Sequence, residues 1–235
     1  MALIQKDFCQ NKQWLSTEHR AQLLLLISAS FANVDASQYF EKYFTCNSAF
    51  GRKLRLYFDG TDIVGYCLLT LHRDDDAILV KASAAFYPEH RQGGNTFDFS
   101  LLVVSQLKLK HPLTPIFYAD TMLSPAMYRA MAKNVAIIYP SSTMPKTCEQ
   151  LFLRFNPSGT FSEFAQRTCV VHAGRTTNYT PQEVASFREN TKKEIAYYCH
   201  ANPDFDKGYA LFVIMPITLK QFLLTGLKLL KNRFH

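Results

Sequence analysis

Three β-rich runs follow one another between residues 53 and 87, and they restrict the fold more than any other feature of the sequence. The first two runs are separated by Asp59-Gly60, a pair typical of tight β-hairpins. The third run, AILVKASAAFY, ends at Pro88, which cannot donate a hydrogen bond to a sheet ladder. The sequence therefore predicts three successive antiparallel strands.

Apolar residues recur at helical spacing on both sides of these runs, and shorter β-rich runs follow in the second half of the chain. Helices are expected at 17–31, 37–44, 97–110, from Ser124, at 149–155 and at 181–198, and further strands at 116–120, 135–139, 167–173 and 209–215. This order predicts an α+β fold with a mixed, mostly antiparallel central sheet and helices on both faces. Because no linker or repeat interrupts it, residues 1–235 are expected to form one domain.

The composition belongs to a folded protein of a reducing compartment. Hydrophobic residues make up 48% of the chain and charged residues 19%, which excludes a disordered segment. The six cysteines form no Cys-x-x-Cys pair and lie far from paired histidines, so neither a disulfide framework nor a metal site is expected. The N-terminus carries charges among its apolar residues and does not resemble a secretory signal, which predicts a cytoplasmic location.

Positive charge is concentrated at the C-terminus. The formal net charge is +7, and residues 207–235 hold five of the 26 Lys and Arg but none of the 19 Asp and Glu. No run of basic residues interleaved with aromatics is present, so nucleic acid is not an expected partner.

Residues 217–235 read as a basic amphipathic helix. Its apolar face would hold Ile217, Phe222, Leu223, Leu224, Leu227 and Leu230, with Lys220, Lys228 and Lys231 mainly opposite. Pro216 and Lys220 argue against a membrane span, because a lysine at the centre of a span costs about 2.5 to 3.5 kcal/mol. Two alternatives stay open: docking on the protein's own sheet, or a peripheral contact with anionic lipid or a partner groove.

The segment YPEHRQGGNT, residues 87–96, joins the third strand to the next helix. The first N–H groups of a helix lack partners, and glycines let a phosphate approach the main chain closely. The segment thus has the elements of a diphosphate site. The alternative is a simple glycine turn that starts a helix packed on a sheet.

These residues resemble motif A of the GNAT superfamily of acyl-CoA N-acyltransferases, and the order of elements over residues 17–139 resembles that family as well. Residues 140–235 would then be a divergent extension. The resemblance implies acetyl-CoA or coenzyme A as cofactor, held in a cleft where the sheet splays. It implies main-chain contacts to pantetheine from the third strand, an oxyanion donor near Phe86, and diphosphate contacts from the turn. The implied cofactor-binding residues are Ala85, Phe86, Tyr87, Arg91, Gln92, Gly93, Gly94, Asn95 and Thr96.

Two positions depart from the family pattern near the cofactor. Thr96 replaces its small final residue, and Asp98 places a carboxylate in the first helical turn, where the diphosphate would lie. An acid there also stabilises the helix through its dipole. Asp98 would repel the cofactor unless its side chain points away.

The resemblance also suggests catalytic residues. The family's tyrosine, which protonates the departing thiolate, would fall at Met131, and Tyr128 lies one turn earlier on the same helix face. Tyr128 is therefore the candidate acid, with half-buried packing as its alternative role. Asp120 at the end of a strand is the second catalytic candidate. Further candidates, each weaker than these two, are Tyr118, His72, Ser83, Glu89 and His90.

The resulting hypothesis is an N-acyltransferase that moves an acyl group, most simply acetyl, from acyl-CoA to a primary amine by direct attack. The amine acceptor, whether small molecule or protein, is not encoded in any motif. The first alternative is a catalytically silent GNAT-like module that binds acyl-CoA or a protein. The second is a peripheral membrane adaptor that acts through the C-terminal helix. A homodimer is a further expectation, since the family is often dimeric.

Overall fold

A computed structural model describes residues 3–12, 14–91, 96–141 and 148–233. Its contacts divide the chain into two compact units, Met1–Thr114 and Pro115–His235. This division falls earlier than the boundary between core and extension that the sequence suggested at 139/140. The single domain stays a prediction.

The first unit contains an antiparallel sheet in the order β1-β3-β4-β5. The three strands expected between residues 53 and 87 are confirmed, and β1 at the edge was not predicted. The bounds are β1 Ile4–Cys9, β3 Gly51–Asp59, β4 Asp62–Asp74 and β5 Ala77–Phe86. The β3–β4 hairpin turns at Gly60, whose φ of 60° lies in the left-handed region that glycine adopts readily.

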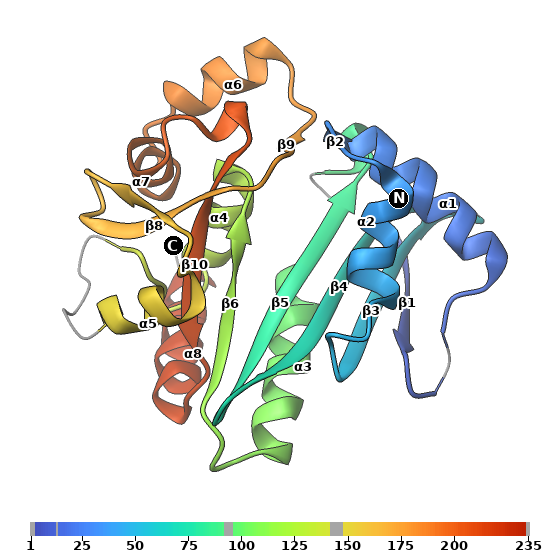
Figure 1. The fold of residues 1–235 in the computed structure, drawn as a ribbon, viewed down its shortest axis with the longest axis horizontal. Coiled ribbons are helices and arrows are strands. Elements are labelled where there is room, and N and C mark those ends of the chain that lie inside the picture. The colour runs from blue at the N-terminus through green and yellow to red at the C-terminus, as the bar shows by residue number, and fades with distance from the viewer. Residues whose placement is uncertain (1–2, 13, 92–95, 142–147, 234–235) are drawn as a thin grey trace. The chain divides into compact units, whose positions relative to one another are not determined.

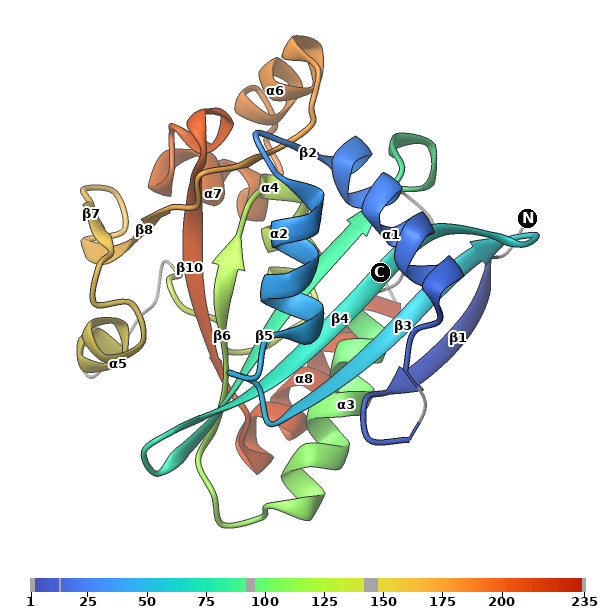
Figure 2. The ribbon, with the colours of Figure 1, turned by 45° about the vertical axis from the view of Figure 1, so that its right-hand side comes forward.

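Helices cover both faces of this sheet (Figure 2). On one face, the α1 residue His19 packs edge-on against Phe58 of β3, with ring centroids 6.2 Å apart. On the other face, the guanidinium of Arg55 in β3 lies 4.7 Å from the ring centroid of Phe99 in α3. The expected helices on both faces are therefore confirmed for this unit. The elements are α1 Thr17–Ser30, β2 Phe31–Ala32, α2 Ala36–Phe40, the π-helical turn Glu41–Thr45, the 3₁₀ turn Pro88–His90 and α3 Thr96–Lys110.

The second unit is also α+β, with an antiparallel sheet in the order β6-β10-β8-β7 (Figure 1). Its strands are β6 Ile116–Met122, β7 Thr160–Ser162, β8 Arg167–His172, β9 Thr176–Thr177 and β10 Tyr209–Pro216. Its helices are α4 Pro125–Ala132, α5 Cys148–Phe155, α6 Pro181–Arg188, α7 Lys193–Ala201, the 3₁₀ turn Phe205–Lys207 and α8 Leu219–Arg233. No helix among the described residues is long and apolar enough to cross a membrane.

Two expectations for the second unit were wrong in detail. The strand expected at 135–139 is a single bridge between Tyr139 and Ile214. The helix expected at 181–198 is interrupted between α6 and α7, where the Asn190 side chain accepts a hydrogen bond from the Lys192 amide at 3.0 Å. Such local side-chain bonds compete with helix continuation.

The ring of Phe86 in β5 lies so close to Gly65 of β4 that it leaves no room for a side chain there. A Cβ built on Gly65 would lie 2.1 Å from Cδ1 of Phe86, whose ring also packs on Tyr57 at 4.9 Å. Gly65→Ala is therefore expected to lower the free energy of unfolding by about 1 to 3 kcal/mol, measured by urea denaturation. Gly51→Ala in β3 is the matched control, because its Cβ would lie 3.5 Å from Leu71, an ordinary contact. Equal stability of the two variants would contradict this packing.

His72 of β4 predicts a pH dependence of stability. Burial, and next the charge of Lys81, lower the pKa of His72 below its usual 6.5. The unfolded chain then binds a proton that the folded chain does not, so this group's contribution is present above pH 6.5 and is lost as pH falls below it. Urea unfolding at about pH 7.5 and about pH 5.5 should show a smaller loss of stability in His72→Gln than in the wild type. An unchanged loss would show that His72 is not the group involved.

Candidate functional site

The end of β5 fixes where the main chain of the candidate site points. The Tyr87 amide donates to the Val64 carbonyl at 3.1 Å, so this pair is a hydrogen-bonded pair of the antiparallel ladder. The adjacent pair, Phe86 and Gly65, is then a non-hydrogen-bonded pair. The main-chain N–H and C=O of Phe86 therefore point to the edge of β5 that lies away from β4.

The same alternation decides which of the predicted pantetheine-binding residues direct their main-chain groups away from β4. The main chains of Ala85 and Tyr87 face β4, whereas Phe86 and, two residues earlier, Ala84 face the other edge. The Phe86 carbonyl accepts a hydrogen bond from the Ser30 hydroxyl of α1 at 3.2 Å. Of the three residues expected to contact pantetheine, Phe86 thus has the suitable main-chain direction.

A short turn leads from this strand toward α3. Pro88–His90 forms one 3₁₀ turn, and the Arg91 amide donates to the Pro88 carbonyl at 3.4 Å. Four of the predicted diphosphate residues, Gln92, Gly93, Gly94 and Asn95, lie outside the described residues. Their predicted contacts to phosphate stay predictions.

The first turn of α3 is oriented by its aromatic residues. Phe97 and Phe99 are buried, while Asp98 between them is exposed. The Ser100 hydroxyl donates to the Thr96 carbonyl at 2.9 Å. The carboxylate of Asp98 therefore lies on the solvent side of the helix.

Beneath α3, Arg55 of β3 contacts both the edge strand β1 and the helix. Arg55 bonds Asp7 of β1 through two hydrogen bonds, at 2.6 and 2.8 Å, and these bonds raise the pKa of Arg55. The same guanidinium stacks on Phe99. This pair links the edge strand β1 to the helix that follows the candidate phosphate turn, although no sequence motif indicated it.

A cluster of three hydroxyl groups lies on the α2 side of the sheet. Ser83 of β5 is 2.6 Å from the Tyr39 hydroxyl and 2.9 Å from the Tyr66 hydroxyl, and all three side chains are buried. Ser83 was a candidate from sequence, whereas the two tyrosines were missed. The only available signal was a polar residue inside an apolar strand.

The remaining candidates of the first unit have structural or solvent-facing positions. Both ring nitrogens of His72 are hydrogen-bonded, to the Ser48 carbonyl at 3.1 Å and to the Thr70 hydroxyl at 2.9 Å. Glu89 is exposed and His90 is half-buried. The bonding of His72 at both nitrogens leaves it poorly suited to act as a base.

In the second unit, Asp120 and Tyr118 lie on β6. Asp120 is half-buried, and its Oδ1 accepts a hydrogen bond from the Thr121 amide at 2.8 Å. Tyr118 is buried. Asp120 has the exposure that a base requires, and its role stays a prediction.

Tyr128 of α4 is more deeply placed than a half-buried packing residue. Its side chain is 3% exposed, and its hydroxyl donates to the Pro140 carbonyl at 3.0 Å. Burial, and next Tyr197, raises the pKa of Tyr128. Met131, where the family's tyrosine would fall, is also buried. A proton could leave Tyr128 for a thiolate only if its bond to Pro140 were broken.

The expected cleft where the sheet splays lies within neither unit as described, so it stays a prediction. The part of the site that lies in one unit fits coenzyme A in three respects. The Phe86 amide points away from β4, the Asp98 side chain is on the solvent side of α3, and the described side chains that flank the turn include the cation Arg91.

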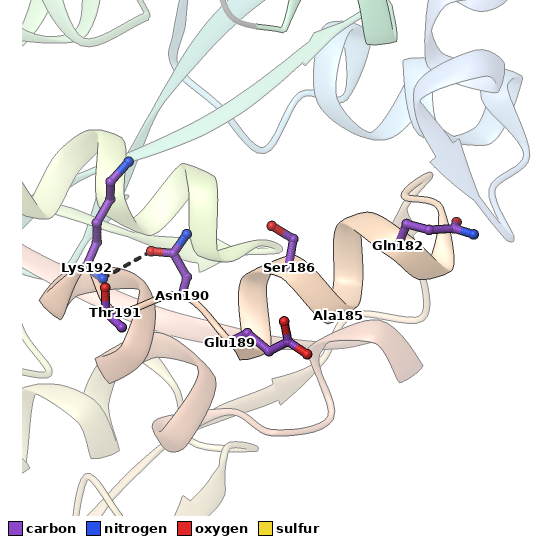
Figure 3. A pocket seen from close by; sticks show the side chains of 7 residues that line it. All are labelled: Gln182, Ala185, Ser186, Glu189, Asn190, Thr191 and Lys192. Atoms are coloured by element: carbon purple, nitrogen blue, oxygen red, sulfur yellow. Dashed lines mark hydrogen bonds between the residues drawn. The ribbon is translucent and has the colours of Figure 1, made fainter.

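Two pockets in the second unit bring together other polar and charged side chains. The first, about 630 Å³, is a shallow hollow along α6 and the turn that follows it, and it contains none of the predicted site residues (Figure 3). The second, about 740 Å³, is lined by Tyr128, Tyr197, Lys193, Glu194 and Lys228 among others. It brings Tyr128 together with Lys193 and Glu194, which the sequence did not single out, and with Lys228 of α8.

No family model and no curated protein matches the chain. Among solved structures, the chain is similar to GNAT-family acetyltransferases and related N-acetyltransferases. One is the ribosomal-protein-S18-alanine N-acetyltransferase of Escherichia coli, with 9% identity, a TM-score of 0.39 and coverage of 91% of this chain and 96% of that one. Another is a GNAT-family acetyltransferase described as putative, from Desulfovibrio desulfuricans, with 8% identity, a TM-score of 0.40 and coverage of 92% and 100%.

A third similar structure is the NatC complex bound to a Gag peptide and CoA, with 11% identity, a TM-score of 0.38 and coverage of 93% of this chain and 100% of that one. Similarity at this level decides nothing about the activity of this chain. The functional argument therefore depends on the chain's own residues.

Tyr128→Phe tests whether the hydroxyl is structural. The substitution leaves the buried Pro140 carbonyl without this donor, so the free energy of unfolding should fall by about 1 to 3 kcal/mol in urea denaturation. Tyr179→Phe is the control, because the half-buried Tyr179 bonds a hydroxyl, Ser124 Oγ, rather than a carbonyl. The control should lose less stability. A Tyr128→Phe protein as stable as the wild type would show that the bond to Pro140 contributes nothing.

Proposed function

We propose that the protein is an acyl-CoA-dependent N-acyltransferase, which transfers an acyl group, most simply acetyl, to a primary amine by direct attack. The observation that carries the proposal is the direction of the main chain at the end of β5. The Phe86 N–H points away from β4, and the chain then turns through Pro88 into α3, whose first amides follow a glycine pair in the sequence.

This arrangement supports binding of a diphosphate with an attached amide arm. The first N–H groups of a helix have no partner within the helix and carry a partial positive charge, so the start of α3 would attract phosphate. Phe99 packs against Arg55 of β3 and Phe97 is buried, so the first turn of α3 is held in place without a cofactor. The outer edge of β5 at Ala84 and Phe86 would hydrogen-bond the arm as a short strand does.

Transfer to an amine needs an oxyanion donor, a base and an acid. Acyl-CoA supplies the thioester, and coenzyme A leaves as the thiolate that the acid protonates. The Phe86 amide is the proposed oxyanion donor, because its N–H lies on the edge of β5 where the arm would bind. Asp120 is the proposed base, by its partial exposure at β6. Tyr128 is the proposed acid only in a state in which its hydroxyl has left Pro140.

The bond from Tyr128 to Pro140 also favours a second candidate function, a catalytically silent module that binds acyl-CoA. Such a module would keep the binding corner, formed by the end of β5 and the start of α3, and would lack the acid that protonates the thiolate. Release of free thiol from acetyl-CoA in the presence of a panel of primary amines separates the two functions, since a silent module leaves the thioester intact.

Coenzyme A binding is the direct test of the corner. Coenzyme A at about 100 times its Kd should stabilise the folded chain by about 2.7 kcal/mol, seen as a rise in Tm. Gly94→Asp should abolish the rise, because its carboxylate would repel the diphosphate at the turn. Gln106→Asp introduces the same side chain at an exposed position of α3 and should keep the rise. A wild-type protein whose Tm does not respond, or an equal rise in Gly94→Asp, would refute the proposal.

A further inference from the structure

Helix α8 is attached to its own unit by polar side chains. Gln221 and Thr225 are 4% and 3% exposed. Gln221 bonds the main chain of Ile137, and Thr225 accepts from the amide of Ala136. The Lys228 ammonium donates to the Ala132 and Val135 carbonyls, at 2.8 Å each. Residues 221, 225 and 228 lie on one face of a helix because they are spaced by four and three.

The inward face of α8 is polar because of what it covers. Residues 136–138 form neither helix nor ladder, so their main-chain groups need partners from elsewhere in the unit. Gln221 Oε1 accepts from the Ile137 amide at 2.9 Å, and its Nε2 donates to the Ile137 carbonyl at 2.7 Å. The helix therefore docks on its own unit through Gln221, Thr225 and Lys228 rather than through the leucines of the predicted apolar face.

The leucines of α8 are left on the outside. Five of them are 38% to 73% exposed: Leu219, Leu223, Leu224, Leu227 and Leu230. At about 100° per residue, four of the five, at positions 219, 223, 227 and 230, form one stripe nearly opposite the polar inward face. Lys220 and Lys231 are exposed and lie along one edge of this stripe. We name these five leucines and two lysines the α8 outer face.

We infer that the α8 outer face binds the surface of an anionic lipid bilayer, with the helix lying in the plane of the interface. Leucines enter the boundary between headgroups and acyl chains, and the lysines contact acidic headgroups. The positive charge of residues 207–235 favours an anionic surface as the binding partner. Residues 207–235 contain no acid, so the surface opposite must supply all the negative charge.

The same charges disfavour a second copy of the chain as the occupant. In a twofold contact, the α8 outer face would meet itself, and its lysines would face lysines without any acid from α8 to balance them. Like charges placed opposite each other destabilise a contact. An anionic bilayer has no such conflict.

The test measures co-sedimentation of the full chain with phosphatidylcholine vesicles, with and without phosphatidylglycerol. Binding is expected to the anionic vesicles alone. Leu223→Ser with Leu227→Ser should weaken partitioning at least about tenfold, since two apolar side chains are lost. Lys220→Gln and Lys231→Gln should each weaken it by about fivefold. Gly226→Leu should strengthen it, because a Cβ there meets no atom within 4 Å and the side chain widens the stripe.

The matched control is Leu25→Ser with Leu153→Ser, which removes two leucines of 67% and 57% exposure outside α8 and should leave partitioning unchanged. Every variant except Gly226→Leu alters exposed positions, Gly226 being half-buried, and unchanged circular dichroism and Tm confirm that each is folded. Three results would overturn the inference. The first is no binding to anionic vesicles, and the second is equal binding by the Leu223/Leu227 variant. The third is a dimer, seen in sedimentation equilibrium without vesicle binding, that the same variant dissociates.

Discussion

Buried main-chain groups outside the strand ladders need hydrogen-bond partners, and the rest of this structure depends on how side chains supply them. At the end of β5, the Ser30 hydroxyl satisfies the Phe86 carbonyl. At the last residue of β6, the Tyr198 hydroxyl donates to the Met122 carbonyl at 2.7 Å. Beyond α4, the side chain of Gln221 bonds both main-chain groups of Ile137. These bonds fix the main chain at the ends of two strands and in the irregular segment that follows α4.

The need to pair buried main-chain groups also limits how Tyr128 and Lys228 can act. Tyr128 donates to a main-chain carbonyl, so its hydroxyl serves the fold unless the second unit rearranges. Lys228 is held by two carbonyls, and burial lowers its pKa. The inward use of Gln221, Thr225 and Lys228 then leaves the leucines of α8 to solvent. The cofactor-binding proposal in the first unit and the lipid-binding proposal in the second thus both depend on how side chains pair main-chain groups.

The sequence predicted the elements whose signals are local. The hairpin at Asp59-Gly60 and the strand that ends before Pro88 are confirmed, because turn residues act within a few positions. Strand β1 was missed because four of its six residues are exposed and its run IQKDFC carries charges at an edge. The face by which α8 docks depends on main-chain groups of Ala132 and of residues 135–137, which are distant in sequence. The direction of the Phe86 amide depends on the register with β4, and no local pattern encodes it.

The central claim is that the end of β5 and the start of α3 form the binding corner for coenzyme A. Amide chemical shifts of ¹⁵N-labelled protein during titration with coenzyme A test it residue by residue. The account predicts that the shifts concentrate at Phe86 and at residues 91 and 96–99, with the signals of β1 and α8 unchanged. Shifts confined to the second unit, or no shifts at a saturating concentration, would contradict it.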